Sequence, residues 1–245
     1  MTRKQYFSSG LKDGMPICFG YFAVSFAFGI QAAGIGLSVF EASVLSVLNV
    51  TSAGQFAALA IIASGASLIE LAFTQLIINL RYFLMSCALS QKLSPSLPLG
   101  HRIGIAYGMT DEIFAVSVSQ REPLSPFYSY GLIAVAIPGW VLGTALGAAA
   151  GNILPAVLTN ALGIAIYGMF IAIILPPAKE NRVVAGVVVL SMVLSALFTY
   201  LPVLCNISSG FRIIVITLIT AGGAALLFPI PDEPAEPEKE MPHEG

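Results

Sequence analysis

Long apolar segments dominate this sequence. Eight of them approach or exceed the ~20 mostly apolar residues that a helix needs to cross a bilayer. They are Pro16–Ala33, Ala42–Ser64, Ser67–Leu89, Arg102–Val118, Phe127–Gly151, Ile153–Leu175, Val183–Leu201 and Ile213–Ile230. Only 10% of the 245 residues are charged, whereas soluble domains contain about 25%. This composition argues against a water-exposed globule and leaves an integral membrane protein as the remaining class.

The spanning segments are predicted to be helices, because lipid cannot satisfy free backbone N–H and C=O groups. The apolar runs are continuous and lack the two-residue alternation of an outer-membrane β-barrel. We therefore expect an all-α, polytopic membrane protein with seven or eight membrane segments. Polar residues interrupt Ala42–Ser64 and Arg102–Val118, so the number stays open between these values.

Three regions are expected along the chain. Residues 1–15 form a short cytoplasmic cap, residues 16–230 a transmembrane transport domain, and residues 231–245 a disordered acidic tail with four prolines. Arg3, Lys4 and Lys12 place the N-terminus in the cytoplasm by the positive-inside rule. Basic residues also occur in the loop after the third segment, so the orientation of the later segments remains open.

A weak internal repeat relates two halves of the chain. Gly20–Val24 is similar to Gly131–Val135, and Gly54–Leu59 is similar to Gly168–Ile173. Many transporters consist of two such halves, with the substrate between them near the membrane midplane. The alternative is similarity by composition alone, because helices rich in glycine, alanine and phenylalanine look alike.

A few ionisable residues fall at membrane depth, where a charge costs at least about 2.5–3.5 kcal/mol and should face the bundle interior or a cavity. Asp111, Glu112 and Arg81 are the main candidates. Neighbouring helical residues point about 100° apart, so one acid is expected to pair with Arg81 while the other faces a pathway. The alternative is an ion pair that only locks helices together. For Glu70 and Glu41 a structural role is favoured.

The second segment contains an unusual polar interruption, Asn49–Gln55. Its hydroxyl and β-branched residues favour an unwound turn or a re-entrant segment. A half-helix starting near Gly54 would direct free N–H groups toward a substrate carboxylate, with Gln55 adding an amide contact. A continuous, closely packed helix is the alternative. The motif Gly139–Thr144 is interpreted mainly as packing, and its Trp140 as a residue that lines a cavity.

Several function classes lack their motifs in this sequence. It contains no P-loop, no His-Glu-x-x-His zinc motif, no Gly-x-Ser-x-Gly nucleophile elbow and no potassium-channel filter. The three cysteines show no metal or disulfide spacing, and no basic stripe indicates nucleic-acid binding. We expect no enzymatic activity, no catalytic residue, no metal and no cofactor.

An ordered set of short motifs resembles the AzlC-type branched-chain amino acid permeases over about residues 10–230. The motifs are Gly14–Tyr21, Phe28-Gly29, Ala53–Phe56, Asn79–Tyr82 and Thr110–Phe114. The resemblance implies an exporter of valine, leucine and isoleucine, and a separately encoded small hydrophobic subunit of the AzlD type. Tyr82 departs from the pattern, because many relatives are expected to have histidine there. A proton-transfer role for a histidine is therefore not carried over.

Together, these inferences predict a gradient-driven exporter that works by alternating access in the cytoplasmic (inner) membrane. Its substrate would be held by Gly54, Gln55, Asn79 and Arg81. Asp111 and Glu112 would couple transport to protons or form ion pairs. The alternative is a channel or a non-transporting scaffold subunit.

Overall fold

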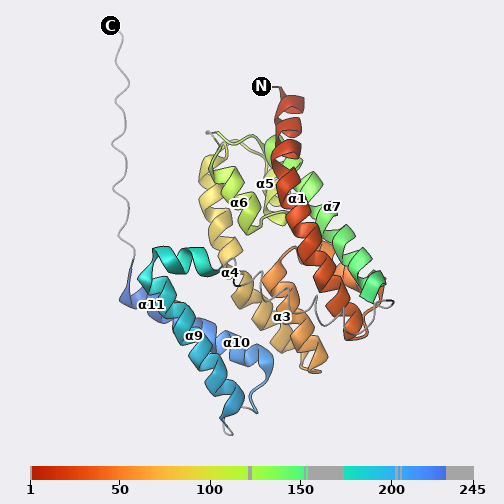
Figure 1. Ribbon diagram of the computed structural model, residues 1–245. Helices are drawn as coiled ribbons and strands as arrows, with labels where there is room; N and C mark the ends of the chain where they lie inside the picture. The colour runs from red at the N-terminus through yellow and green to blue at the C-terminus, as the bar shows by residue number, and fades with distance from the viewer. Residues whose placement is uncertain are drawn as a thin grey trace.

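The computed structural model describes residues 2–120, 123–151, 153, 171, 174–201, 204 and 206–229. Helices make up nearly all of these residues, and no strand occurs among them, which confirms the all-α class (Figure 1). The elements are α1 (Arg3–Gly34), α2 (Val39–Leu48), α3 (Ser52–Ala63), α4 (Leu68–Lys92), α5 (Leu99–Tyr107), α6 (Asp111–Val118), α7 (Pro126–Gly151), α9 (Arg182–Tyr200), α10 (Ser209–Thr217), the π-helical turn η1 (Leu218–Gly222) and α11 (Gly223–Leu227).

Five described helices are long and apolar enough to cross a membrane. They are α1, α4, α7, α9 and the continuous run Ser209–Leu227 formed by α10, η1 and α11. The predicted span Ile153–Leu175 lies largely outside the described residues, and the tail 231–245 lies wholly outside them. The total of seven or eight spans therefore stays a prediction.

The expected N-terminal cap is helical and continuous with the first span. α1 begins at Arg3, and a reciprocal hydrogen-bond pair between Thr2 and Gln5 caps this end. The first turns of α1 already pack against α7, where Gly10 lies next to Gly131. Residues 3–15 are therefore the start of a 32-residue helix; the side of the membrane on which they lie stays a prediction.

The two polar interruptions break both doubtful segments into half-helices. α2 ends at Leu48 and α3 begins at Ser52, two residues before the expected start near Gly54. In the same way, α5 ends at Tyr107 and α6 begins at Asp111. The four pieces contain 10, 12, 9 and 8 residues, so none crosses a bilayer alone.

Helices α1 and α7 run side by side and parallel, and they form the best-buried part of the molecule (Figure 1). The contact between these two helices runs along small residues of α7. Gly139 lies against Cys18, while a Cβ on Gly143 or Gly147 would overlap the backbone of α1. Small residues allow this close approach of helix backbones in membranes, which confirms the packing interpretation of the Gly139–Thr144 motif.

The predicted internal repeat pairs these same two helices. The second pair of the repeat involves residues 168–173, of which only Ile171 is described. The repeat therefore stays a prediction.

Candidate functional site

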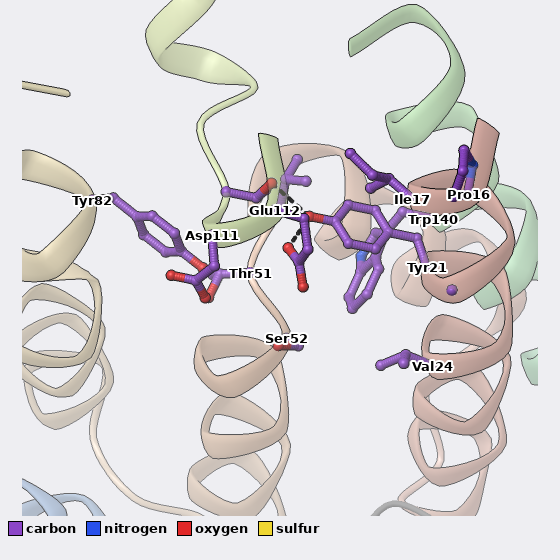
Figure 2. Close-up of a pocket in the computed structure, with 13 residues that line it drawn as sticks. Pro16, Ile17, Tyr21, Val24, Thr51, Ser52, Tyr82, Asp111, Glu112 and Trp140 are labelled. Carbon is purple, nitrogen blue, oxygen red and sulfur yellow. Dashed lines mark hydrogen bonds between the residues drawn. The ribbon is translucent and has the colours of Figure 1, made fainter. Parts of the chain in front are cut away.

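A cavity of about 430 Å³ lies where the long helices meet the two helix breaks (Figure 2). Tyr21, Tyr82 and Trp140 line it from near the midpoints of α1, α4 and α7. The cavity is therefore at the depth expected for the membrane midplane. Its lining is Pro16, Ile17, Gly20, Tyr21, Val24, Val50, Thr51, Ser52, Tyr82, Thr110, Asp111, Glu112 and Trp140.

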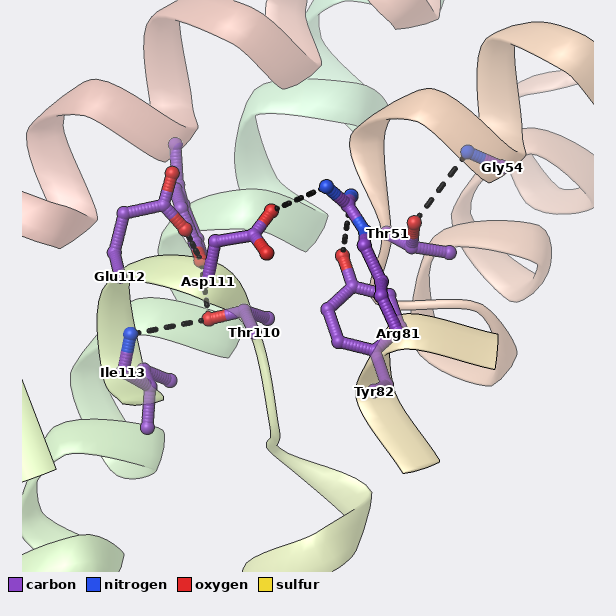
Figure 3. Close-up of polar contacts among 9 residues, drawn as sticks. Thr51, Gly54, Arg81, Tyr82, Thr110, Asp111, Glu112 and Ile113 are labelled. Atoms are coloured by element: carbon purple, nitrogen blue, oxygen red, sulfur yellow. Dashed lines mark hydrogen bonds and ion pairs between the residues drawn. The ribbon is translucent and has the colours of Figure 1, made fainter. Parts of the chain in front are cut away.

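Two helix N-termini meet at this cavity, each capped by a threonine. The hydroxyl of Thr51 accepts from the Gly54 N–H at 3.4 Å, and that of Thr110 accepts from the Ile113 N–H at 3.3 Å (Figure 3). α3 has no acidic residue in its first turn, whereas α6 begins with two. The helix dipole thus leaves the α3 end electropositive, while the α6 end carries carboxylates.

Arg81 and Asp111 form an ion pair beside the cavity. Arg81 Nη1 lies 3.0 Å from Asp111 Oδ2, and the two side chains remain 41% and 40% exposed. Arg81 also donates to the Tyr82 hydroxyl at 3.1 Å (Figure 3). The expected pairing of one acid with Arg81 is present. Asp111 lines the cavity, whereas Arg81 is absent from the residues that line it.

The second acid, Glu112, takes part in a hydrogen-bond chain that runs through Tyr21. The Tyr21 hydroxyl lies 2.5 Å from both Thr110 Oγ1 and Glu112 Oε2 (Figure 2). Because a phenol carries one proton, we assign it to the bond to Glu112, so Thr110 donates to Tyr21. Sequence reasoning did not identify Tyr21 as a site residue; its position in the Gly14–Tyr21 motif is the signal that could have done so.

The side of the cavity formed by α1 and α7 is largely apolar. Ile17, Val24 and Trp140 line it there (Figure 2). The ring of Trp140 meets Tyr21 edge-on, with centroids 5.3 Å apart, an arrangement that aromatic pairs favour. Trp140 therefore lines the cavity as expected, and a ligand there meets charges at one side and hydrocarbon at the other.

Gln55 lies behind this wall. It is fully buried, accepts from Trp140 Nε1 at 3.0 Å and donates to Ser46 Oγ at 3.1 Å. The Ser46 hydroxyl in turn hydrogen-bonds Thr144 at 2.7 Å. Gln55 thus joins α2, α3 and α7, and it is absent from the residues that line the cavity.

Gly54 and Asn79 are also absent from the residues that line the cavity, and both hydrogen-bond the side chain of Gln75. The Gly54 N–H binds Thr51, and its carbonyl accepts from Gln75 Nε2 at 2.8 Å. Asn79 Nδ2 donates to Gln75 Oε1 at 3.2 Å. At the start of α3, the backbone N–H groups with no intrahelical acceptor are those of Ser52 and Ala53. The donors predicted at Gly54 therefore fall one or two residues earlier.

Broken helices whose ends meet a cavity at mid-depth, among long apolar helices, define a polytopic helical membrane protein. Many transporters bind their substrates at such helix breaks. The AzlC protein family matches residues 16–154, more than half of the chain. The chain belongs to this family.

Two relatives support this assignment. An uncharacterized membrane protein of Archaeoglobus fulgidus is 35% identical over 76% of this chain and 83% of its own length. The inner membrane protein YgaZ of Escherichia coli is 31% identical over 72% of this chain and 75% of its own length. No solved structure gave a significant match.

Proposed function

We propose that this AzlC-family membrane protein exports branched-chain amino acids such as valine, leucine and isoleucine through the central cavity. The observation that carries the proposal is the composition of that cavity, where the N-terminus of α3 and two acids lie beside apolar residues, and where Arg81 forms an ion pair with one of these acids. An α-amino acid with an aliphatic side chain has this same distribution of charge and hydrocarbon. The cavity volume of about 430 Å³ falls in the range of small-molecule sites, roughly 300–1,000 Å³.

In the proposed complex, each part of the amino acid has its own partner. The carboxylate binds the free N–H groups at the start of α3 and the guanidinium of Arg81. The ammonium binds Glu112, which is oriented by Tyr21. The aliphatic side chain packs against Trp140 and the apolar residues beside it.

The ion pair between Arg81 and Asp111 gives this scheme a way to respond to substrate. Without substrate, the two charges satisfy each other at 3.0 Å. A zwitterion carries one charge of each sign, so its carboxylate replaces Asp111 at Arg81, while its ammonium lies between the carboxylates of Glu112 and Asp111, without a net change of charge. Opening of this pair would release the link between α4 and α6 and favour a second conformation, as alternating access requires.

We further propose that the chain lies in the cytoplasmic (inner) membrane with its N-terminus in the cytoplasm, and that it has no enzymatic activity. Transport is driven by an ion gradient, with Asp111 and Glu112 as ion-pairing or proton-carrying groups.

A small hydrophobic subunit of the AzlD type is the proposed partner. α4 and α9 supply apolar surface for it, since only 11% and 6% of their most apolar stretches are buried within this chain.

The test is efflux of labelled valine from cells that contain both subunits. Asp111→Asn removes the partner of Arg81 and should abolish efflux while the protein level stays normal. Asp13→Asn is the matched control, because Asp13 accepts from Tyr128 at 2.7 Å and is absent from the cavity lining. Efflux by Asp111→Asn at the wild-type rate would remove Asp111 from the mechanism.

A channel or a scaffold subunit is the competing function. A carrier saturates with substrate and supports counterflow in liposomes that contain both chains. Conductance without saturation would instead identify a channel, and neither behaviour would be expected of a scaffold.

A further inference from the structure

Gly20 is a glycine of α1 that the packing of this helix does not explain. On the same helix, a Cβ on Gly10, Gly14 or Gly29 would overlap atoms of α7, so close helix contact accounts for these glycines. A Cβ on Gly20 would meet no heavy atom of the described residues within 4 Å beyond its own stretch of α1. Glycine inside a helix is less stable than alanine, so Gly20 lowers the stability of α1 with no gain in packing.

The open space beside Gly20 belongs to the central cavity. Gly20 is exposed and lines that cavity. Ile17 and Val24, which lie three residues before it and four residues after it, line the cavity from the same face of α1. Gly20 is therefore a gap between larger side chains, and a side chain at this position would occupy part of the cavity.

This gap lies on the apolar side of the cavity. Its neighbours Ile17 and Val24 are aliphatic, and Trp140 lines the cavity from the adjoining helix α7. In Figure 2, Val24 of α1 and Asp111 of α6 lie on opposite sides of the cavity. A zwitterion held by the polar side would therefore direct its hydrocarbon toward the face of α1 that contains Gly20.

Flexibility of α1 is the competing explanation for this glycine. Pro16 lies inside the helix, four residues before Gly20, and proline interrupts the hydrogen bonds of a helix and kinks it. A glycine close to such a kink would make bending easier. Bending would affect all substrates alike, whereas a gap in the cavity lining would distinguish substrates by the length of their side chains.

We propose that Gly20 determines the size of the aliphatic side chain that the cavity accepts. The space beside it takes the terminal methyl groups of leucine and isoleucine, while the single methyl group of alanine is too short to reach it. This inference rests on the proposed function and deepens it, because it names the residue that separates large aliphatic substrates from small ones.

The test measures equilibrium binding of alanine, valine and leucine to the purified wild type, Gly20→Ala and Gly20→Leu. One methylene group more or less in an apolar pocket changes discrimination by about 10–200-fold. We therefore expect Gly20→Ala to weaken leucine binding about tenfold and Gly20→Leu to weaken it about 100-fold or more, with valine less affected than leucine. Alanine affinity should change by less than about threefold, because the new side chain fills space that alanine does not use.

Gly34→Leu is the matched control. A Cβ on Gly34 also meets no described heavy atom within 4 Å, and this residue ends α1 outside the cavity lining. Its affinities for all three amino acids should equal those of wild type. The thermal midpoint is measured in the same samples, and that of Gly20→Ala should equal or exceed the wild-type value, because alanine favours the helix and has room there.

Three results would overturn the proposal. They are an unchanged ratio of leucine to alanine affinity in both Gly20 variants, an equal loss of affinity for alanine and leucine, which would identify a flexible point of α1, and the same change of ratio in Gly34→Leu. Each of these results leaves the proposed function intact when wild type binds valine and leucine. A wild type that binds no branched-chain amino acid would refute the proposed function itself, and this inference with it.

Discussion

The hydroxyl of Tyr21 is predicted to hold Glu112 in position for the substrate ammonium, and Tyr21→Phe removes this hydroxyl alone. The ring stays, so the edge-on contact with Trp140 at 5.3 Å is retained. Thr110 loses its acceptor but still accepts from the backbone of α6. The substitution therefore reports on the polar contact rather than on packing.

The size of the effect follows from the geometry. The hydroxyl lies 2.5 Å from Glu112 Oε2, and a hydrogen bond to a charged group contributes about 1.5–3 kcal/mol. Glu112 is exposed to the cavity, so we take the lower value. About 1.5 kcal/mol corresponds to roughly a tenfold loss in affinity for valine.

The assay combines valine binding with thermal unfolding of the purified protein. Tyr128→Phe is the matched control, since Tyr128 is buried, donates to the Asp13 carboxylate at 2.7 Å and lies outside the cavity. Both variants should lower the free energy of unfolding by about 1–3 kcal/mol. Only Tyr21→Phe should also weaken valine binding.

Two results would refute this reasoning. Wild-type valine affinity in Tyr21→Phe would show that Glu112 needs no orientation by Tyr21. An equal loss of affinity in Tyr128→Phe would show that the effect arises from general destabilisation rather than from the cavity.

Two further substitutions test the packing that supports the site. Gly147→Ala should lower the free energy of unfolding by about 1–3 kcal/mol through overpacking, because its Cβ would overlap the backbone of Phe26. Gly186→Ala is the control and should be neutral or slightly stabilising, because open space surrounds the new Cβ. Equal thermal midpoints for the two variants would contradict the close helix contact. Gln55→Leu should cost about 1–3 kcal/mol for each polar group left unpaired, the indole of Trp140 among them; an unchanged thermal midpoint would show that this network contributes little.

The sequence predicted the features that depend on local chemistry. Apolar runs indicate helices in lipid, whatever their neighbours are, because the backbone must satisfy its own hydrogen bonds. The interruption at Asn49–Gln55 predicted the break before α3, since threonine and serine favour a cap over a helix interior. Charges at membrane depth indicated where to look for a site because their insertion is costly.

The second break had a comparable local pattern, with Thr110 before two acids. Sequence reasoning noted polar residues there without predicting two half-helices. Gly108 ends α5 and Thr110 caps α6, but glycine and threonine also occur inside membrane helices, so local preference left a continuous helix open. Packing against α1 and α4 favours the break over a continuous helix, because the break lets Thr110 reach Tyr21 and Asp111 reach Arg81.

By itself, the sequence determined that this chain is a helical membrane protein with a few charges at membrane depth and a broken segment. Only the tertiary structure decided that Tyr21 holds Glu112 and that Gln55 supports the cavity wall. These partners are 91 and 85 residues apart. Hydropathy and helix preference act over a few residues, whereas such contacts depend on which helices lie side by side and in what register.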